Sequence, residues 1–177
     1  MKQHLKFLPA FILLCSIFLL PSASCVYKFN EASIAPEYRT VRVNFIENRA
    51  PYKNPQLSPN LTDRIRQKII NQTRLIQTNN QENAHYDITG TITDYSVSTT
   101  GITSANGQSQ TSINRLTVTV KITKTDLLKN TDNQDFTVTR QFDFGATQSL
   151  QQAESTLLDE MVRNLTDEIF NRLFSNW

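Results

Sequence analysis

Few side chains in this sequence have a type that could carry out catalysis. The chain has two histidines, His4 and His85, and two cysteines, Cys15 and Cys25. His85 stands alone at the start of a predicted strand, where a surface or edge position is more common than a general base. Because histidine and cysteine are so few, a Cys/His metal site cannot be assembled.

Acidic pairs and glycines give no stronger catalytic signal. Asp159-Glu160 and Asp167-Glu168 lie in a helical pattern, where neighbouring carboxylates usually form a solvated face. The chain has 4 glycines and no Gly-rich phosphate-binding loop. We therefore predict that the protein is not an enzyme and that it requires no metal or cofactor.

Cys25 is the one residue whose position predicts a chemical modification. It follows residues 1–24, which have lysines near their start, an apolar centre and the small residues Ser22-Ala23-Ser24 at their end. This is the pattern of an export signal, and its apolar centre is too short for a membrane-spanning helix. If the signal is cut before Cys25, Cys15 leaves with it and no internal disulfide can form.

The residues around Cys25 resemble a bacterial lipobox, in which the cysteine becomes the acylated first residue of the mature protein. The leucine usually found three places before that cysteine is Ser22 here, and Leu20 lies further back. An ordinary signal followed by a coincidental cysteine is the alternative. Val26 stands where an aspartate retains some lipoproteins in the inner membrane, which favours the outer membrane. We expect residues 25–39 to be a lipidated tether.

The net charge excludes one class of partner. The chain has 18 Lys+Arg and 16 Asp+Glu, and two of the lysines lie in residues 1–24, so the mature chain carries 16 − 16 = 0. Nucleic-acid binding depends on a net basic field, and we therefore predict no nucleic-acid partner. Residues 40–177 have the length of a single domain, and no repeat interrupts them.

A strand and a helix are predicted in the first half of this domain. Thr40–Glu47 alternates between apolar and polar residues, with Val41, Val43 and Phe45 on one face. A proline-rich loop follows, and Ser58-Pro59 is typical of a helix start with Ser58 as the cap. The helix is predicted through residue 77 from an apolar stripe: Leu61, Ile65, Ile69, Ile70, Leu75 and Ile76.

Three alternating segments predict three further strands, each with one apolar and one polar face. Threonines dominate the polar faces. Residues 98–112 connect the first two of these strands and contain Asn106-Gly107, a strong hairpin signal, so they form either an extended hairpin or a mobile loop. The apolar faces consist of Tyr86, Ile88 and Ile92, then Leu116, Val118, Val120 and Ile122, then Phe136, Val138, Phe142 and Phe144.

A long helix closes the domain. Ser149 and Gln152 fit a capping box, and an apolar stripe then runs to Phe174. The predicted order is β-α-β-β-β-α. A crossover through the first helix sets the first strand parallel to a neighbour, and the later strands form a meander. We therefore predict an α+β fold, a two-layer sandwich with two helices packed on one face of a four-stranded mixed sheet.

Three basic residues on the predicted strands could bind a ligand or pair across the sheet. Arg115 and Lys121 share the polar face of one strand, and Arg140 has the apolar parity of the next. At a sheet edge Arg140 can extend its guanidinium to solvent, whereas burying it in an ion pair is costly. Since Arg and Lys bind phosphates, Arg115 and Lys121 are our candidates for binding an anionic ligand.

Short strings across the chain resemble those of a known family. They are Cys25-Val-Tyr-Lys-Phe-Asn-Glu-Ala-Ser-Ile34, Thr40-Val-Arg-Val-Asn-Phe45, Leu57-Ser-Pro-Asn-Leu-Thr-Asp63 and Tyr86-Asp-Ile-Thr-Gly90. Together with the order of the elements, they resemble the LptE family of lipopolysaccharide-assembly lipoproteins.

The resemblance implies an outer-membrane lipoprotein whose domain faces the periplasm. Such a protein sits inside the β-barrel translocon LptD and helps to deliver lipopolysaccharide to the cell surface. Its polar sheet face would then meet the polar lumen of the barrel, and Arg115 and Lys121 would be candidates for the phosphates of lipopolysaccharide. The alternative is a structural adaptor or pilot lipoprotein of another envelope barrel or secretion machine.

Overall fold

The computed structural model describes residues 34–100 and 113–174. Cys25 and Asn106-Gly107 lie outside these ranges, so the predicted acylation site and hairpin tip are not part of the description. The elements are β1 (Thr40–Val43), β2 (Glu47–Asn48), α2 (Leu57–Gln72), β3 (Ile76–Gln77), the 3-10 helix η2 (Gln81–Asn83), β4 (Tyr86–Thr100), β5 (Ile113–Asp126), β6 (Gln134–Gly145) and α3 (Leu150–Phe174).

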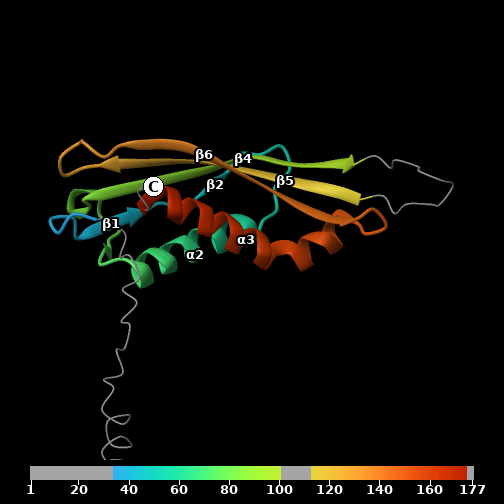
Figure 1. Cartoon of the computed structure of the whole chain (residues 1–177), viewed down its shortest axis with the longest axis horizontal. Helices are drawn as coiled ribbons and strands as arrows, with labels where there is room; N and C mark the ends of the chain where they lie inside the picture. Colours follow the sequence, from blue (N-terminus) through green and yellow to red (C-terminus); the bar gives the residue numbers. More distant parts are fainter. Residues whose placement is uncertain (1–33, 101–112, 175–177) are drawn as a thin grey trace, which may run out of the picture.

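The fold is the predicted α+β class, with α2 and α3 on one face of a mixed sheet (Figure 1). The strand order is β3-β1-β4-β5-β6, and the short β2 also pairs with β4. β1 is parallel to β3 and β4, as expected from a crossover through the first helix. β4, β5 and β6 form the predicted antiparallel meander, and β4 and β5 stay paired as far as Thr100 and Ile113.

The sheet has six strands, and the prediction of four was wrong. The predicted first strand is interrupted, because the chain changes phase between Phe45 and Ile46. Phe45 is 55% exposed, and Ile46, at 2%, enters the core in its place. Gly90 makes room for this entry, since a Cβ there would lie 2.9 Å from the Ile46 side chain. The residues after the interruption then pair separately as β2.

The sixth strand comes from residues that were predicted to be helical. α2 ends at Gln72, and Thr73 is already extended, with φ −133° and ψ 173°. Ile76 therefore lies in β3 and is 67% exposed, so its place in the helical stripe was wrong. Ile70 also faces solvent, whereas Leu75 is buried. The apolar spacing alone could not distinguish a longer helix from a short parallel strand.

Of the two predicted helix starts, the one at α3 is confirmed and the cap predicted for α2 is wrong. Ser149 and Gln152 form the predicted capping box, with the Ser149 N–H donating to Gln152 Oε1 at 3.0 Å and the Gln152 N–H donating to Ser149 Oγ at 3.3 Å. Ser58 does not cap α2, because it lies one residue inside the helix and is buried. Instead, Asn54 Oδ1 accepts from the backbone N–H of Gln56 just before the helix, at 2.9 Å.

The core lies between the helices and the sheet. β5 contributes the apolar row that was predicted for it, and every member of that row is fully buried. Leu61, Ile65 and Ile69 of α2 and Leu165 of α3 are no more than 1% exposed on the opposite side of this layer. Within the described ranges, neither helix combines the length and apolar character that a membrane span requires.

Candidate functional site

The sheet face opposite the helices is polar and rich in threonine. Its threonine hydroxyls bond across the strands, with Thr119 Oγ1 3.1 Å from Thr139 Oγ1 and Thr123 Oγ1 donating to Asp135 at 3.2 Å. Because side chains alternate along each strand, this polarity follows from the same parity that buries the apolar rows. We call this surface the polar sheet face: Thr89, Thr91, Thr93, Arg115, Thr117, Thr119, Lys121, Thr123, Asp135, Thr137, Thr139, Gln141 and Asp143.

Both predicted ligand-binding cations lie on the polar sheet face, and each pairs with an aspartate of β6. Arg115 donates two hydrogen bonds to the Asp143 carboxylate, at 2.7 and 2.9 Å, because the two residues are directly opposite in the ladder. These hydrogen bonds lower the pKa of Asp143 below its ordinary value. The Nζ of Lys121 lies 3.1 Å from Asp135. Both pairs are partly exposed, so they balance charge and add little stability.

The structure does not bring Arg115 and Lys121 together. They are six residues apart on one strand, which separates their Cα atoms by about 20 Å. Lys121 borders a hollow of about 430 Å³, and Arg115 is not among the residues that line it. The two cations are therefore separate contact points on one face.

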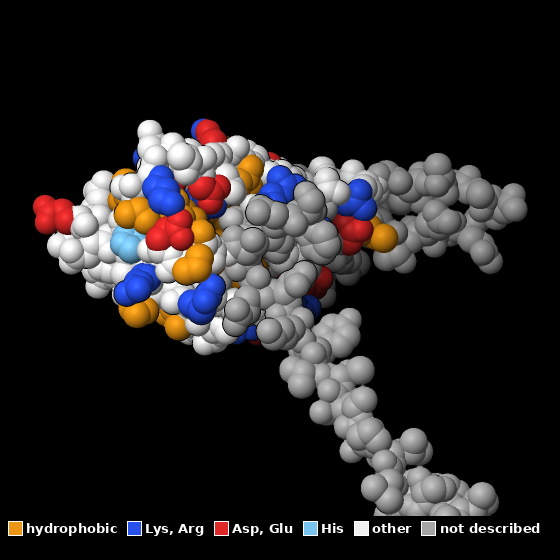
Figure 2. Space-filling view, turned by 60° about the vertical axis from the view of Figure 1, so that its left-hand side comes forward, with side chains coloured by type: hydrophobic (Ala, Val, Ile, Leu, Met, Phe, Trp, Pro, Cys, Tyr) orange, Lys and Arg blue, Asp and Glu red, His pale blue; other side chains and the backbone are white. Residues whose placement is uncertain are grey.

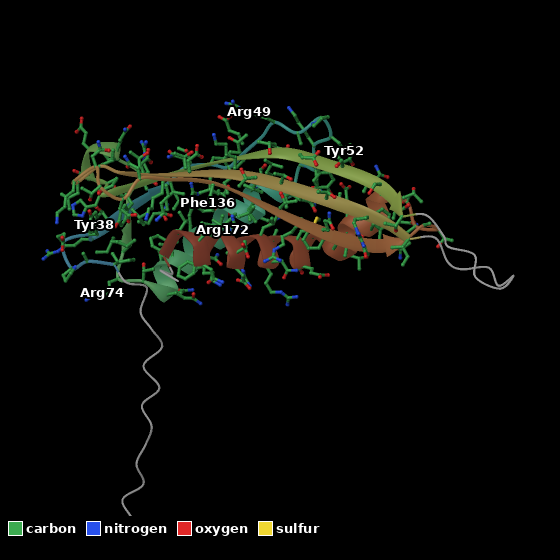
Figure 3. All side chains as sticks on the ribbon, turned by 45° about the horizontal axis from the view of Figure 1, so that its top comes forward. Tyr38, Arg49, Tyr52, Arg74, Phe136 and Arg172 are labelled. Atoms are coloured by element: carbon green, nitrogen blue, oxygen red, sulfur yellow. The ribbon has the colours of Figure 1, made fainter. Side chains whose placement is uncertain are left out.

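Arg49 shares this hollow with Lys121 and was missed in the sequence. Its side chain lies on the outer side of the sheet (Figure 3) and is 72% exposed, in an ion pair with Glu47. Its backbone N–H donates to the Ile92 oxygen at 2.9 Å, which extends the pairing of β2. The alternation of Glu47 and Arg49 around Asn48 was the available signal, but the following prolines favoured a loop.

A second missed cation, Arg42, is held more tightly. Its guanidinium donates to both oxygens of Asp87 at 2.8 and 2.9 Å, and Asn44 Nδ2 donates to the same carboxylate at 2.7 Å. The Asp87 hydrogen bonds raise the pKa of Arg42. Arg42 borders a larger hollow of about 840 Å³, whose other lining residues are Asn79, Asn80, Gln81, Glu82, Ala84 and Leu127.

Arg140 lies on the edge strand β6, as expected for a charged residue with apolar parity. Its side chain is 44% exposed and forms an ion pair with Glu168 of α3. Glu168 also accepts from Arg172, one turn further along the helix. Arg140 thus extends past the sheet edge to solvent, as predicted, and links the edge to the last helix.

Two charged residues at the end of β5 are buried, and their burial was not predicted. Lys124 and Asp126 continue the apolar parity of the strand and are 2% and 1% exposed. The Asp126 carboxylate accepts hydrogen bonds from the Tyr38 hydroxyl and from backbone N–H groups of the following turn. Burial alone would raise its pKa, but these donors outweigh burial and hold the pKa well below its ordinary value.

A buried carboxylate and two tyrosines connect α3 to the loop before α2. The Tyr95 hydroxyl donates to Glu154 at 2.7 Å and the Tyr52 hydroxyl donates to it at 3.2 Å. A bulge after Ile92 turns Tyr95 toward the core. Burial and the Glu154 carboxylate raise the pKa of Tyr95, so its hydroxyl remains a donor. Within the described ranges, no group of three or more His, Cys, Asp or Glu could hold a metal ion.

The solved structures that are similar to this chain share little of its sequence. No curated protein matches the chain. Similar solved structures include a minor lipoprotein from Acinetobacter baumannii, with 16% identity, coverage of 77% of this chain and 96% of that chain, and a TM-score of 0.44. Another is the rare lipoprotein B from Shewanella oneidensis, with 14% identity, coverage of 75% and 92%, and a TM-score of 0.42. These similarities are too low to support a functional inference.

The family comparison is more extensive. The model of the family described as "LptE: Lipopolysaccharide-assembly" matches residues 38–173. This range covers every described helix and strand except the last residue of α3. The chain therefore belongs to the LptE family of lipopolysaccharide assembly.

Proposed function

We propose that the protein is a lipid-anchored component of lipopolysaccharide assembly at the outer membrane. Cys25 would carry the lipid, and the domain would face the periplasm. The polar sheet face would lie against the lumen of an LptD-like β-barrel, which the protein would plug and support. The LptE-family match supports a role in lipopolysaccharide assembly, and the one-sided burial of the sheet supports the orientation.

The observation that carries this proposal is the difference between the two faces of the sheet. α2 and α3 cover one face, whereas the other face exposes hydroxyls and cross-strand ion pairs. The lumen walls of outer-membrane barrels are polar. A face of hydroxyls and balanced charges can meet such a wall without burying an unpaired charge, which would be costly.

Lipopolysaccharide carries phosphates, and Lys121 with Arg49 forms the best-placed pair of cations for one of them. Both border the same hollow, and among the described residues both are paired only with exposed carboxylates, Asp135 and Glu47. A phosphate can replace these carboxylates as the partner of either cation. Arg115 remains a candidate for a separate contact further along the strand.

Purification of the full chain from outer membranes of its own host tests this proposal. We expect an LptD homologue, identified by mass spectrometry, to co-purify with lipopolysaccharide in the same complex. A Cys25→Ala variant should leave the membrane fraction while keeping its folded domain. Recovery of a different barrel or of a secretion channel, without lipopolysaccharide, would favour the adaptor function instead.

A further inference from the structure

The end of the domain where the described chain begins has an unusual surface. Ile76, Leu127 and Leu128 are 67%, 39% and 43% exposed there. Ile76 belongs to the short edge strand β3, and the two leucines follow β5 directly. Turns usually favour Gly, Asn, Asp and Ser, each for its backbone or hydrogen-bonding properties. Two adjacent exposed leucines at a turn therefore suggest a contact outside the domain.

Backbone hydrogen bonds align these residues in one row across the end of the sheet. Ile76 pairs with Thr40, whose oxygen accepts from the His85 N–H at 3.2 Å. The His85 oxygen in turn accepts from the Leu127 N–H at 2.8 Å. Ile76 and Leu127 thus lie at opposite ends of a single row across the sheet, and Leu128 is the next residue in the chain after Leu127. We call Ile76, Leu127 and Leu128 the end patch.

The end patch is held rigidly. Asp126 is buried, and its Oδ1 accepts from the backbone N–H groups of Leu128 and Lys129 at 3.0 Å each. The same carboxylate accepts from the Tyr38 hydroxyl at 2.9 Å, which fixes the turn to the start of the domain. The leucines therefore point outward from an ordered turn, and their exposure does not result from a loose loop.

Two basic residues lie beside Ile76 of the end patch: the Ile76 N–H donates to the Arg39 oxygen, and Arg74 is two residues before Ile76. Arg39 and Arg74 are exposed, and within the described residues no ion pair engages either of them. Figure 3 shows Tyr38 and Arg74 at this same end, and an Arg74 N–H lies 3.5 Å from the Ile34 oxygen. Figure 2 shows apolar and basic side chains gathered around the histidine on this face, with acidic ones among them. Exposed apolar residues beside basic side chains are typical of a surface that binds an anionic bilayer.

The distance to the proposed anchor fits the same surface. Ile34 is the first described residue, and nine chain steps separate it from Cys25. A fully extended chain of that length spans about 32 Å at most. If Cys25 carries lipid, the end of the domain that contains Ile34 must stay near the bilayer, and the opposite end of the sheet need not.

We propose that the end patch contacts the phospholipid bilayer directly, as a second attachment beside the lipid on Cys25. This inference rests on the proposed lipid anchor. Ile76, Leu127 and Leu128 would enter the boundary between headgroups and acyl chains, while Arg39 and Arg74 would remain among the anionic headgroups. The contact would fix the orientation of the domain relative to the membrane, which a single attachment through Cys25 would not do.

Tryptophan fluorescence in the full-length, acylated protein tests this contact. The chain has 1 Trp, Trp177, so Trp177→Phe gives a background without tryptophan. Leu128→Trp is the reporter, and Val97→Trp is a matched control, because Val97 is 42% exposed on β4 toward the other end of the sheet. Each protein is reconstituted in phosphatidylethanolamine/phosphatidylglycerol vesicles whose acyl chains are brominated.

We expect bromolipid to quench Leu128→Trp on the order of twofold, as for a side chain at the headgroup–acyl boundary, and to leave Val97→Trp unchanged. Ile76→Trp is a second reporter on a different element, in case the first variant unfolds in a thermal melt. Absence of quenching at both reporters, or equal quenching at Val97→Trp, would overturn the end patch as a membrane contact. If an added barrel protein shields both reporters while bromolipid does not quench them, the end patch is likewise overturned as a membrane contact.

Mass spectrometry of the same samples separates this inference from the proposed function. An acylated Cys25 with unquenched reporters would refute the end patch and leave the anchor intact. A protein without acylation that does not bind vesicles would refute the anchor itself, and the end patch with it.

Discussion

The Lys124 ammonium donates a hydrogen bond of 3.3 Å to the backbone oxygen of Leu173, in the last turn of α3. The same Nζ donates to Asp132 at 2.7 Å and lies over the rings of Tyr86 and Phe174. A cation at the C-terminus of a helix is favoured by the helix dipole. One buried lysine thus joins β5, the turn before β6 and the end of the last helix.

Replacing Lys124 with alanine should destabilise the domain by about 3 kcal/mol, because it leaves the Leu173 oxygen without its donor and opens a gap between two aromatic rings. Urea unfolding followed by circular dichroism measures this loss. Lys121→Ala is the matched control on the same strand, since Lys121 is 52% exposed, and it should stay within about 0.5 kcal/mol of wild type. Equal effects of the two substitutions would contradict the role given to Lys124.

Asp126→Asn should change how stability depends on pH. The folded-state pKa of Asp126 is lowered from its ordinary value of 3.8, so its contribution is complete above that value and is lost as pH falls below it. We therefore expect the variant to be less stable than wild type at pH 7, and the difference to shrink as the pH falls below 3.8. Urea midpoints at pH 7 and pH 3 test this. A constant difference would show that the charge of Asp126 is not what stabilises the turn.

Leu165→Ala should be among the costly changes in α3. Leu165 is fully buried between the helix and the sheet, and truncation of such a leucine costs about 2–5 kcal/mol. Arg163→Ala, at an exposed position of the same helix, controls for helix propensity. If the two denaturation midpoints were alike, α3 would not cover the sheet in solution.

Charge-reversal substitutions should show whether Lys121 and Arg115 contribute independently to ligand binding. We expect Lys121→Glu to weaken lipopolysaccharide binding by roughly tenfold, through loss of a charge-assisted contact and repulsion of phosphate. Arg115→Glu should act independently, because the two residues lie far apart on β5. Lys53→Glu, at an exposed position in the loop before α2, is the control for net charge.

Binding of purified lipopolysaccharide by each full-length variant, together with its thermal unfolding, gives the readout. A loss of binding that the Lys53→Glu control reproduces would indicate nonspecific attraction. Unchanged binding in both Lys121→Glu and Arg115→Glu would remove the polar sheet face as a ligand site.

Regular patterns made most of the fold predictable. The alternation in β4, β5 and β6 correctly predicted the buried rows except for Phe136, which is half-buried, and the capping box correctly placed the start of α3. The interruption at Phe45 and Ile46 was not predictable from alternation, because it depends on the space that Gly90 leaves in a distant strand. The short strand β3 was not predicted for a related reason, since two residues form a strand only when a partner strand lies beside them.

The candidate site was less predictable than the fold. Parity placed Arg115 and Lys121 on the polar face, but only the ladder register shows that Asp143 and Asp135 neutralise them. Lys124 and Asp126 have the parity of core residues, and a charge in the core depends on partners from the next turn and the last helix. Two of these partners, Leu173 for Lys124 and Tyr38 for Asp126, are distant in sequence, and no local pattern reveals them.

Site-specific photo-crosslinking in living cells tests most directly whether the polar sheet face lies against a barrel. Crosslinkers at Lys121 and Thr139 report from this face, and Gln67 and Arg163 report from the outer side of the helices. We expect Lys121 and Thr139 to capture a β-barrel protein that mass spectrometry identifies as an LptD homologue, at higher yield than the helix positions. Capture of only soluble periplasmic proteins from Lys121 and Thr139, or of the barrel from the helix positions alone, would contradict the proposed orientation.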